Sequence, residues 1–363
     1  MGSLVMADAL RTFKGKRVFL TGHTGFKGSW LAYLLTMLGA EVKGYALPPL
    51  TQDSHFDQLG LRQLIHHVEG DVRDAGYLVH AITEFAPEYV LHLAAQALVK
   101  RSFGDPVETF STNVMGSVHL LEAVRVTPSV RSLVYITSDK CYENREWIWG
   151  YRENDRLGGH DPYSASKAAA EIVFSAYWRS FLSQRHNFGA ASTRAGNVIG
   201  GGDSAADRIV PDCIRAIQAN GTVLLRSPSA TRPWQHVLEP LSGYLLLAAN
   251  IHADPGRFAG SWNFGPSSTQ CRTVGDVAKY IVSYFGRGEV VIPASATSQH
   301  EAQLLQLNCD KAHQELNWYP RWDVDKTLAA TAGWYQAVMD GEQAKAVTSR
   351  QICEYFPEID ELA

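Results

Sequence analysis

A tyrosine and a lysine, Tyr163 and Lys167, stand four residues apart in the stretch Tyr-Ser-Ala-Ser-Lys. On a helix this spacing places both side chains on the same face. An ammonium group beside a phenol favours the phenolate and lowers the tyrosine pKa from about 10 toward neutral pH, as a general base for a hydroxyl proton requires. Ser138, at the end of a predicted strand, could share that proton. Such pairs are common on helix surfaces, so the surrounding elements decide what this one does.

A glycine-rich turn, Thr-Gly-His-Thr-Gly-Phe-Lys-Gly from Thr21 to Gly28, lies between a predicted strand and a predicted helix. Its glycines permit a tight turn, close approach of a pyrophosphate, and close packing of helix on strand. Free N–H groups at the start of the helix would bind the phosphates. The turn therefore predicts a dinucleotide site made of Gly22, Thr24, Gly25, Phe26, Lys27 and Gly28.

One part of the usual dinucleotide pattern is missing. The acidic residue expected about 20 residues further on, which binds the ribose 2′-hydroxyl, is replaced by Leu47-Pro48-Pro49. That stretch contains no arginine for a 2′-phosphate either. NAD is therefore favoured over NADP, but only modestly.

Short apolar runs alternate with helical patterns over the first half of the chain, as in βαβ units. We predict strands over 17–21, 41–47, 65–68, 89–93, 132–137 and 189–193, with helices over 30–38, 78–85, 105–121 and from 162 onward. Later helical stretches cover 209–219, 239–249 and 273–285. The pattern predicts an α/β fold, a doubly wound parallel sheet of Rossmann type with a smaller C-terminal domain.

The length of 363 residues exceeds the roughly 250 to 300 that one hydrophobic core supports. We expect a dinucleotide-binding domain over 16–196, to which a later segment of about 234–265 returns. Residues 197–355 are expected to form mainly the substrate-binding domain.

Composition excludes several classes of protein. Net charge is −4, with 33 basic and 37 acidic residues, so a nucleic-acid surface is not expected. The longest apolar run is about eight residues, against roughly 20 for a membrane span. The first residues lack the order of a secretory signal. Five cysteines without a C-x-x-C pair predict reduced thiols in a cytoplasmic protein and no structural metal site.

Further motifs complete a resemblance to a known family. Together with the glycine turn, Ser138 and the Tyr163–Lys167 pair, the stretches Asp71-Val72, Leu93-Ala94-Ala95 and Asn113-Val-Met-Gly116 resemble the extended short-chain dehydrogenase/reductase family, over about residues 16–334. Within that family, four stretches look like the CDP-glucose 4,6-dehydratase branch: 137–144, 161–167, 194–203 and 232–240.

The resemblance implies an NAD-dependent hydro-lyase that converts CDP-D-glucose to the 4-keto-6-deoxy sugar, an early step toward deoxysugars of bacterial surface lipopolysaccharide. It implies adenine contacts from Asp71 and Val72, and a cofactor lining that includes Leu93, Ala94, Ala95 and Thr112 as well as Tyr163 and Lys167. Asn197, Arg208, Arg232 and His236 would face the nucleotide sugar, since arginine matches a diphosphate by bidentate geometry. A homodimer or homotetramer is implied, paired through the helices of residues 107–121 and 168–177.

Asp139 and Lys140 depart from the wider sugar-dehydratase pattern. The dTDP-glucose relatives carry an Asp-Glu pair as acid and base at this point. Here Asp139 would protonate the leaving C6 hydroxyl and Lys140 would remove the C5 proton. A lysine is a base only where burial or nearby positive charge lowers its pKa from about 10.4, and Lys167 with an oxidised nicotinamide would supply that charge.

Other interpretations of the same residues remain open. A related nucleotide-sugar 4,6-dehydratase or 4-epimerase would keep most motifs, and a non-catalytic NAD-sensing protein would need only the glycine turn. Arg208 and Arg232 could be surface ion pairs, and Asp139 could cap the next segment. His66-His67 is more simply a structural pair than a metal site. Trp147 and Trp149 could cover the sugar or pack internally.

Overall fold

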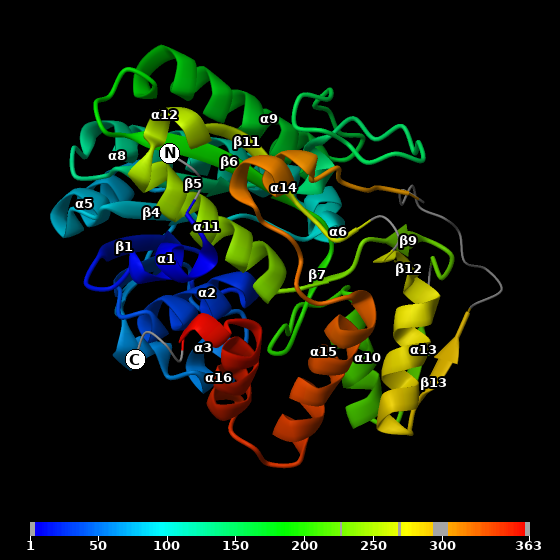
Figure 1. Cartoon of the computed structure of the whole chain (residues 1–363). Helices are drawn as coiled ribbons and strands as arrows, with labels where there is room; N and C mark the ends of the chain where they lie inside the picture. The colour runs from blue at the N-terminus through cyan, green and yellow to red at the C-terminus, as the bar shows by residue number, and fades with distance from the viewer. Residues whose placement is uncertain (1–3, 226, 268–269, 293–303, 360–363) are drawn as a thin grey trace.

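The computed structural model of the chain describes residues 4–225, 227–267, 270–292 and 304–359. Its centre is a seven-stranded sheet in the order β3-β2-β1-β4-β5-β6-β11, with every neighbouring pair parallel (Figure 1). The strands are β1 (Arg17–Thr21), β2 (Glu41–Ala46), β3 (His66–Glu69), β4 (Tyr89–His92), β5 (Ser132–Ile136), β6 (Gly189–Ala195) and β11 (Gly260–Phe264). The strand order reverses between β1 and β4, where doubly wound sheets bind their ligands. The predicted doubly wound fold is confirmed.

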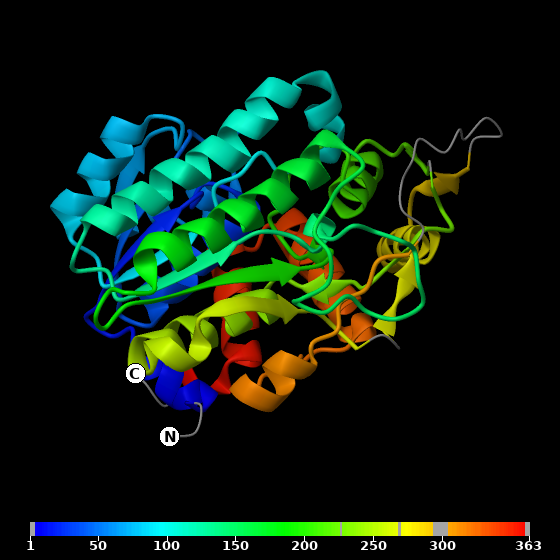
Figure 2. The ribbon, with the colours of Figure 1, turned by 90° about the horizontal axis from the view of Figure 1, so that it is seen from above.

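Helices cover both faces of the sheet (Figure 2). One layer is α5 (Ala75–Phe85), α8 (Gly116–Val126) and α9 (Pro162–Tyr177), which share a core with Phe19, Val90 and Leu133 of the strands. The other face packs on α2 (Phe26–Met37) and α11 (Leu238–Ala253) through Val18 and Leu20. Because alternate side chains of each strand point to opposite faces, strands buried on both sides are apolar throughout, as the sequence pattern indicated.

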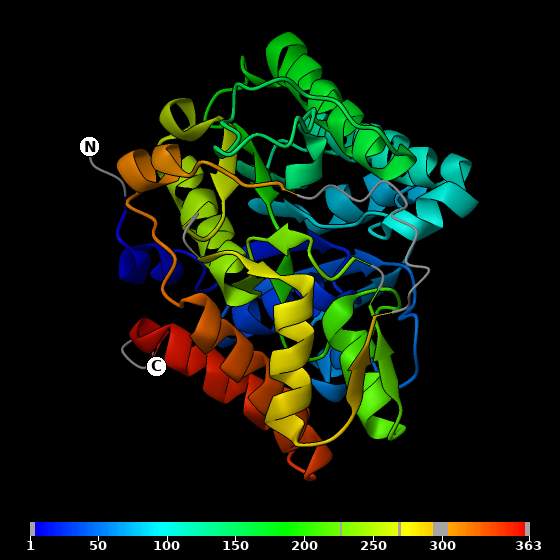
Figure 3. The same ribbon diagram turned by 90° about the vertical axis from the view of Figure 1, so that its right-hand side faces the viewer.

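The C-terminal part supplies a seventh strand and a smaller set of elements. α11 packs against β5 and β6, and β11 pairs with β6 at the sheet edge. Beyond the carboxyl ends of the strands lie α10 (Ile209–Gln218), α13 (Val274–Phe285) and α15 (Val324–Met339) (Figure 3). Three two-stranded pairs accompany them: β7 (Val198–Ile199) with β10 (Gln235–His236), β8 (Thr222–Leu224) with β13 (Glu289–Val291), and β9 (Thr231–Arg232) with β12 (Arg272–Thr273).

The remaining elements are short, apart from the C-terminal α16. They are α1 (Met6–Arg11), α3 (His55–Gln58), α4 (Leu61–Leu64), α6 (Val99–Gly104), α7 (Pro106–Phe110), α12 (Pro255–Phe258), α14 (Asp310–Leu316), α16 (Ala344–Tyr355), the 3₁₀ turns η2 (Asp139–Cys141) and η5 (Pro357–Ile359), and the π-helical turns η1 (Ser111–Met115) and η3 (Trp178–Leu182). In the described ranges each helix is too short or too polar to cross a bilayer.

The helix predicted over 105–121 runs without a break from Pro106 to Val126, but its middle turn is π-helical. Asp105 caps its start as expected, because its carboxylate accepts a hydrogen bond from the Glu108 amide at 2.8 Å. The π-helical turn η1 then separates α7 from α8. Such turns are often found at functional sites, and this one carries Asn113, which binds the loop after β4.

Candidate active site

Tyr163 and Lys167 lie in the first turns of α9, at the carboxyl edge of the sheet. Pro162 starts this helix and Asp161 caps it, accepting a hydrogen bond from the Ser164 amide at 3.0 Å. The two side chains are only 8% and 6% exposed. Ser138 follows β5 after one residue, Thr137, and its hydroxyl lies close enough to the Tyr163 phenol to favour the phenolate. The structure therefore brings together the three residues that the sequence singled out.

Burial, rather than the lysine, dominates the acidity of the phenol in this ligand-free protein. Desolvation raises the pKa of Tyr163 to about 12, and the Ser138 hydrogen bond and the Arg208 charge only partly offset it. The expected fall of the Tyr163 pKa toward neutral pH is therefore wrong here. Burial also lowers the pKa of Lys167 to about 8, although the Cys141 thiol and the Glu171 carboxylate favour its charged form.

Asp139 and Lys140 form the short turn η2 immediately after Ser138. The Ser138 hydroxyl caps this turn and donates a hydrogen bond to Asp139 Oδ1 at 2.9 Å, so the interpretation of Asp139 as the cap is wrong. Asp139 is 4% exposed. Burial raises its pKa, against the opposing effects of Lys140, the Ser138 hydrogen bond, Arg232 and Lys27. A buried carboxyl whose pKa is raised is suited to act as a general acid.

The glycine turn has the geometry of a phosphate cradle. Gly22 has a φ of +77°, and a Cβ at Gly28 would lie 2.0 Å from the Gly22 carbonyl oxygen. A Cβ atom added at Gly25 would lie 3.4 Å from the Gly22 carbonyl oxygen, so the turn is open on that side. No side chain caps the N-terminus of α2, so its first N–H groups are available to an anion. These features fit a dinucleotide pyrophosphate.

The first residues of the turn and of α2 face different surroundings. The Thr24 hydroxyl donates to the Leu47 carbonyl oxygen at 2.9 Å. Lys27, half-buried, lies within the electrostatic reach of Asp139, Arg208 and Lys167, and its burial lowers its pKa to about 8. Phe26 lies near Gly200, at the junction with the C-terminal part. Lys27 therefore borders the catalytic residues as well as the predicted cofactor site.

The loop after β4, which contains Leu93, Ala94 and Ala95, is held by residues that the sequence interpretation did not assign. Thr21 Oγ1 accepts hydrogen bonds from the amides of Leu93 and Ala94, both at 3.1 Å, and lies 2.7 Å from His92 Nδ1. Asn113 Oδ1 accepts from the Gln96 amide at 2.8 Å. Thr21 ends a strand just before the first glycine, and Asn113 stands in a motif of the family resemblance, so both had a signal in the sequence.

The predicted adenine contacts follow β3. The Asp71 carboxylate is paired with Arg73, with its two oxygens 2.9 and 3.0 Å from Arg73 Nε, and its pKa lies below the usual range because of that hydrogen-bonded pair. Val72 packs against Gly116. A Cβ atom added at Gly116 would lie 2.7 Å from the Val72 side chain. Thr112 lies in the π-helical turn η1. Their contacts with adenine and NAD stay predictions.

Two of the predicted substrate arginines approach the catalytic residues. Arg208 forms an ion pair with Asp203 at 2.9 Å, and its charge reaches both Tyr163 and Lys27. Arg232 is 4% exposed, and its charge acts on Asp139. Asn197 lies between β6 and β7, and its carbonyl oxygen accepts from the Gln235 amide at 3.1 Å. These positive charges suit a diphosphate ligand.

The structure places His236 in the core, unlike the other residues predicted to bind the nucleotide sugar. Its ring is fully buried, with its centroid 5.7 Å from that of Trp30 and 4.8 Å from that of Trp322, and burial lowers its pKa to about 3. A histidine enclosed by two tryptophans is part of the core, which does not support the predicted contact with the nucleotide sugar.

Two groups of residues kept open in the sequence interpretation have structural contacts. His67 Nδ1 lies 2.7 Å from Nε2 of His23, and His66 pairs with Glu41 at 3.2 Å. Trp147 packs on the Tyr151 ring, with centroids 5.1 Å apart, whereas Trp149 is 61% exposed. His66 and His67 are therefore structural. Of Trp147 and Trp149, only Trp149 remains available to cover a ligand.

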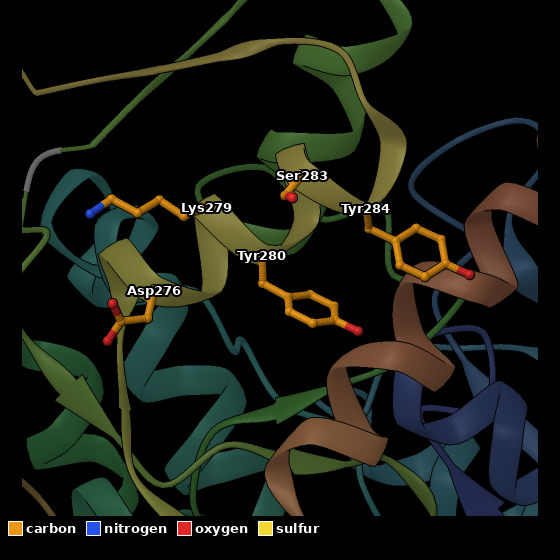
Figure 4. Close-up of a pocket in the computed structure, with 5 residues that line it drawn as sticks. All are labelled: Asp276, Lys279, Tyr280, Ser283 and Tyr284. Carbon is orange, nitrogen blue, oxygen red and sulfur yellow. The ribbon is translucent and has the colours of Figure 1, made fainter.

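A surface groove of about 420 Å³ on α13 lies apart from these residues (Figure 4). Its lining comes from Asp276, Lys279, Tyr280, Ser283 and Tyr284, and the two tyrosines point toward α15. None of the predicted catalytic or binding residues contributes to it. We therefore assign the active site to the carboxyl edge of the sheet.

The doubly wound sheet, the open glycine turn, and Ser138 beside the buried Tyr163 and Lys167 define a short-chain dehydrogenase/reductase of the extended type. The family model described as GDP-mannose 4,6 dehydratase matches residues 19–331. The chain belongs to this family, which confirms the resemblance seen in the sequence.

Individual relatives agree with this assignment. The chain is 48% identical over 348 residues to the CDP-glucose 4,6-dehydratase of Salmonella typhimurium, covering 95% of this chain and 97% of that protein. It is 28% identical over 328 residues to a dTDP-glucose 4,6-dehydratase of Streptomyces antibioticus, covering 88% and 92%.

Solved structures have the same fold. A dTDP-glucose 4,6-dehydratase of Streptomyces venezuelae, with NAD and TYD bound, superposes with a TM-score of 0.75 at 23% identity and covers 90% of this chain and 99% of that one. The UDP-glucose 4-epimerase of Thermus thermophilus, in complex with NAD, gives 0.72 at 26% identity, with coverage of 88% and 99%. Dehydratases and epimerases share this architecture, so the residues around Tyr163 must distinguish them.

Proposed function

We propose that this protein is an NAD-dependent CDP-glucose 4,6-dehydratase, a hydro-lyase that forms CDP-4-keto-6-deoxy-D-glucose. The observation that carries this proposal is the buried Asp139 carboxyl, hydrogen-bonded to Ser138 and followed by Lys140, beside Tyr163. Near-full-length identity of 48% to a CDP-glucose 4,6-dehydratase supports the nucleotide sugar.

The chain's own residues fit NAD. Its pyrophosphate would lie on the open glycine turn from Gly22 to Gly28, and its adenine near Asp71 and Val72. The loop of Leu93, Ala94 and Ala95 with Thr112 would border the rest. When bound, NAD accepts hydride from C4 of the sugar, returns it to C6, and in its oxidised form adds a positive charge that favours the Tyr163 phenolate.

The residues around the sugar divide the proton transfers. Tyr163, assisted by Ser138 and Lys167, takes the C4 hydroxyl proton as C4 is oxidised to a ketone. The ketone acidifies the C5–H bond, and Lys140 removes that proton. Asp139 gives its proton to the C6 hydroxyl, which leaves as water and produces a C5–C6 double bond. Reduction at C6 and return of a proton to C5 then complete the 4-keto-6-deoxy sugar.

A 4-epimerase on the same fold would oxidise and reduce C4 alone. It would need no acid to expel the C6 hydroxyl, so the buried Asp139 carboxyl, whose pKa is raised by burial, favours dehydration.

The division of roles is tested with the Lys140→Met variant in deuterium oxide. We expect wild type to form a 4-keto sugar, seen by its absorbance, that carries solvent deuterium at C5. The variant should still oxidise C4 while losing at least about 100-fold in C5 exchange. Wild-type exchange in Lys140→Met would remove Lys140 as the base, and absence of a 4-keto product from wild type would refute the function.

We further propose that two copies pair through the outer face of α7, η1 and α9. Val107, Met115 and Ile172 are 77%, 47% and 59% exposed there. Val107 and Met115 also line a groove of about 520 Å³. Its other lining residues are Pro106, Phe110, Ser111, Val114 and Ala169. Apolar patches of this kind mark interaction surfaces. Ile172→Glu should convert a dimer or tetramer to smaller species in light scattering; an unchanged mass would exclude this face.

The remaining assignments are proposals of the same kind. We place the cofactor domain at 16–196 with the return of about 234–265, and the sugar-binding domain mainly at 197–355. All five cysteines lie in the described part of the chain and are outside disulfides, which supports a cytoplasmic location.

A further inference from the structure

Glu171 is a buried carboxylate that the reaction described above does not use. It lies one helical turn beyond Lys167, so Tyr163, Lys167 and Glu171, spaced by four, follow one face of α9. The side chain is 2% exposed. An ionised group is almost never buried to this extent unless it is paired.

Three hydrogen bonds join Glu171 to two neighbouring strands. Oε1 accepts from Thr137 Oγ1 at 2.5 Å, and Oε2 accepts from Ser192 Oγ and from the Arg194 guanidinium, both at 2.8 Å. Thr137 immediately precedes Ser138, whereas Ser192 and Arg194 lie on β6. One carboxylate thus ties the helix that carries Tyr163 and Lys167 to the end of β5 that carries Ser138 and Asp139.

Arg194 keeps this carboxylate charged. Although burial acts to raise it, the pKa of Glu171 lies below its usual range because of the Arg194 charge and the three hydrogen bonds. Arg194 is itself held by the Tyr142 hydroxyl at 2.7 Å and the Glu153 carbonyl oxygen at 2.9 Å. These two bonds hold Arg194 in place against Glu171.

Lys167 is surrounded by titratable groups from four elements. Glu171 of α9 and Cys141 of η2 favour its charged form, and burial opposes it. The Lys167 charge in turn acts on Lys27 of α2 and on His92 of β4, disfavouring the charged form of each. Glu171 is the one carboxylate among these groups.

We propose that Glu171 is a positioning residue for the reaction: through Thr137 it fixes Ser138 against α9, and its negative charge keeps Lys167 protonated beside Tyr163. This inference rests on the proposed function, because Ser138 and Lys167 matter only if Tyr163 is the base.

The hydrogen bond from Thr137 to Glu171 is tested with Thr137→Val. This change removes one hydroxyl and leaves the Glu171–Arg194 pair intact. We expect kcat for 4-keto sugar formation to fall about tenfold, because Ser138 loses its fixed distance to Tyr163. Thr137→Ser keeps the hydroxyl and should restore most of the rate. The matched control is Thr127→Val: Thr127 is also buried, but its hydroxyl bonds Ala123 away from the site, so kcat should hold.

The charge is tested with Glu171→Gln through the pH profile of kcat. Loss of the negative charge lowers the pKa of Lys167, so the alkaline limb should move down by about one pH unit, a shift that damage to packing alone would not cause. Should this variant fail to fold, the Thr137 series decides alone.

The outcomes separate the two proposals. No 4-keto sugar from wild type refutes the function itself. An active wild type, with Thr137→Val as fast as Thr127→Val, overturns the positioning role and leaves the function standing. An unmoved alkaline limb in folded Glu171→Gln removes the electrostatic part of the role.

Discussion

The cofactor half and the substrate half of the site are built in different ways. The cofactor half is centred on a contiguous turn, Gly22 to Gly28, in which close backbone contacts at Gly22 and Gly28 exclude larger residues. The substrate half collects Asn197, Arg208 and Arg232 from separate loops and a short strand beyond the sheet. Tyr163 joins the two, within reach of Ser138 on one side and Arg208 on the other.

The difference indicates where specificity resides. A turn fixed by close backbone contacts suits the cofactor site, which dehydratases and epimerases share. Arginines on loops can be moved or replaced without disturbing the sheet, because loops tolerate change. We therefore expect changes in the turn to abolish cofactor binding and changes in the arginines to alter affinity for the nucleotide sugar.

The residue common to both halves should give the largest effect. Tyr163→Phe keeps the ring and removes the proton acceptor, so we expect kcat to fall by about 10³-fold with NAD affinity unchanged. Single-turnover formation of NADH with CDP-glucose measures the step. The matched control is Tyr77→Phe, at an exposed tyrosine of α5. A wild-type rate of NADH formation in Tyr163→Phe would contradict the assigned base.

A methyl group in the turn should affect the cofactor half alone. In Gly28→Ala the added carbon would lie 2.0 Å from the Gly22 carbonyl oxygen, so the turn must open. We expect NAD affinity to fall about 100-fold, measured by calorimetry. Gly256→Ala, in α12, where the added carbon would meet nothing within 4 Å, is the control and should bind NAD normally. Equal affinity in both variants would show that the turn does not hold NAD.

A charge-conserving change should affect the substrate half alone. Arg232→Lys retains the positive charge but loses the guanidinium fork, so we expect KM for CDP-glucose to rise about tenfold with NAD affinity unchanged. Arg272, its partner across the β9–β12 pair, is more exposed and pairs with Asp325, so Arg272→Lys is the control. If both variants had wild-type KM values, Arg232 would not bind substrate.

The smallest effect is on pH dependence. Burial lowers the pKa of Lys167 to about 8, and the reaction needs its charged form, so activity is lost as pH rises through about 8. With that pKa, we expect kcat to fall roughly fivefold between pH 8 and 9. Arginine stays protonated in this range, so the residual activity of Lys167→Arg should lack this limb. The same limb in that variant would assign it to another group.

Sequence reasoning predicted the features that depend on local pattern. The alternation of buried runs indicated the sheet, and the motifs at Gly22–Gly28, Ser138 and Tyr163–Lys167 fell at one edge of it because parallel strands end together. β11 lies within the segment of about 234–265 that was expected to return to the cofactor domain. These features need no knowledge of long-range packing.

What the sequence could not give depends on contacts between distant residues. His236 stands in a motif of the family resemblance, but Trp30 and Trp322 enclose its ring. The Tyr163 pKa depends on how completely the fold excludes water, which residue spacing does not reveal. The Glu171 anchor combines side chains 34, 21 and 23 residues away in the chain.

The central claim is that hydrogen moves within the sugar from C4 to C6 as water leaves. The direct measurement is incubation of the purified protein with CDP-glucose deuterated at C4, followed by NMR of the sugar. The account predicts a 4-keto product with deuterium in its C6 methyl group. Deuterium retained at C4 in a product that keeps its C6 hydroxyl would indicate an epimerase and contradict the account.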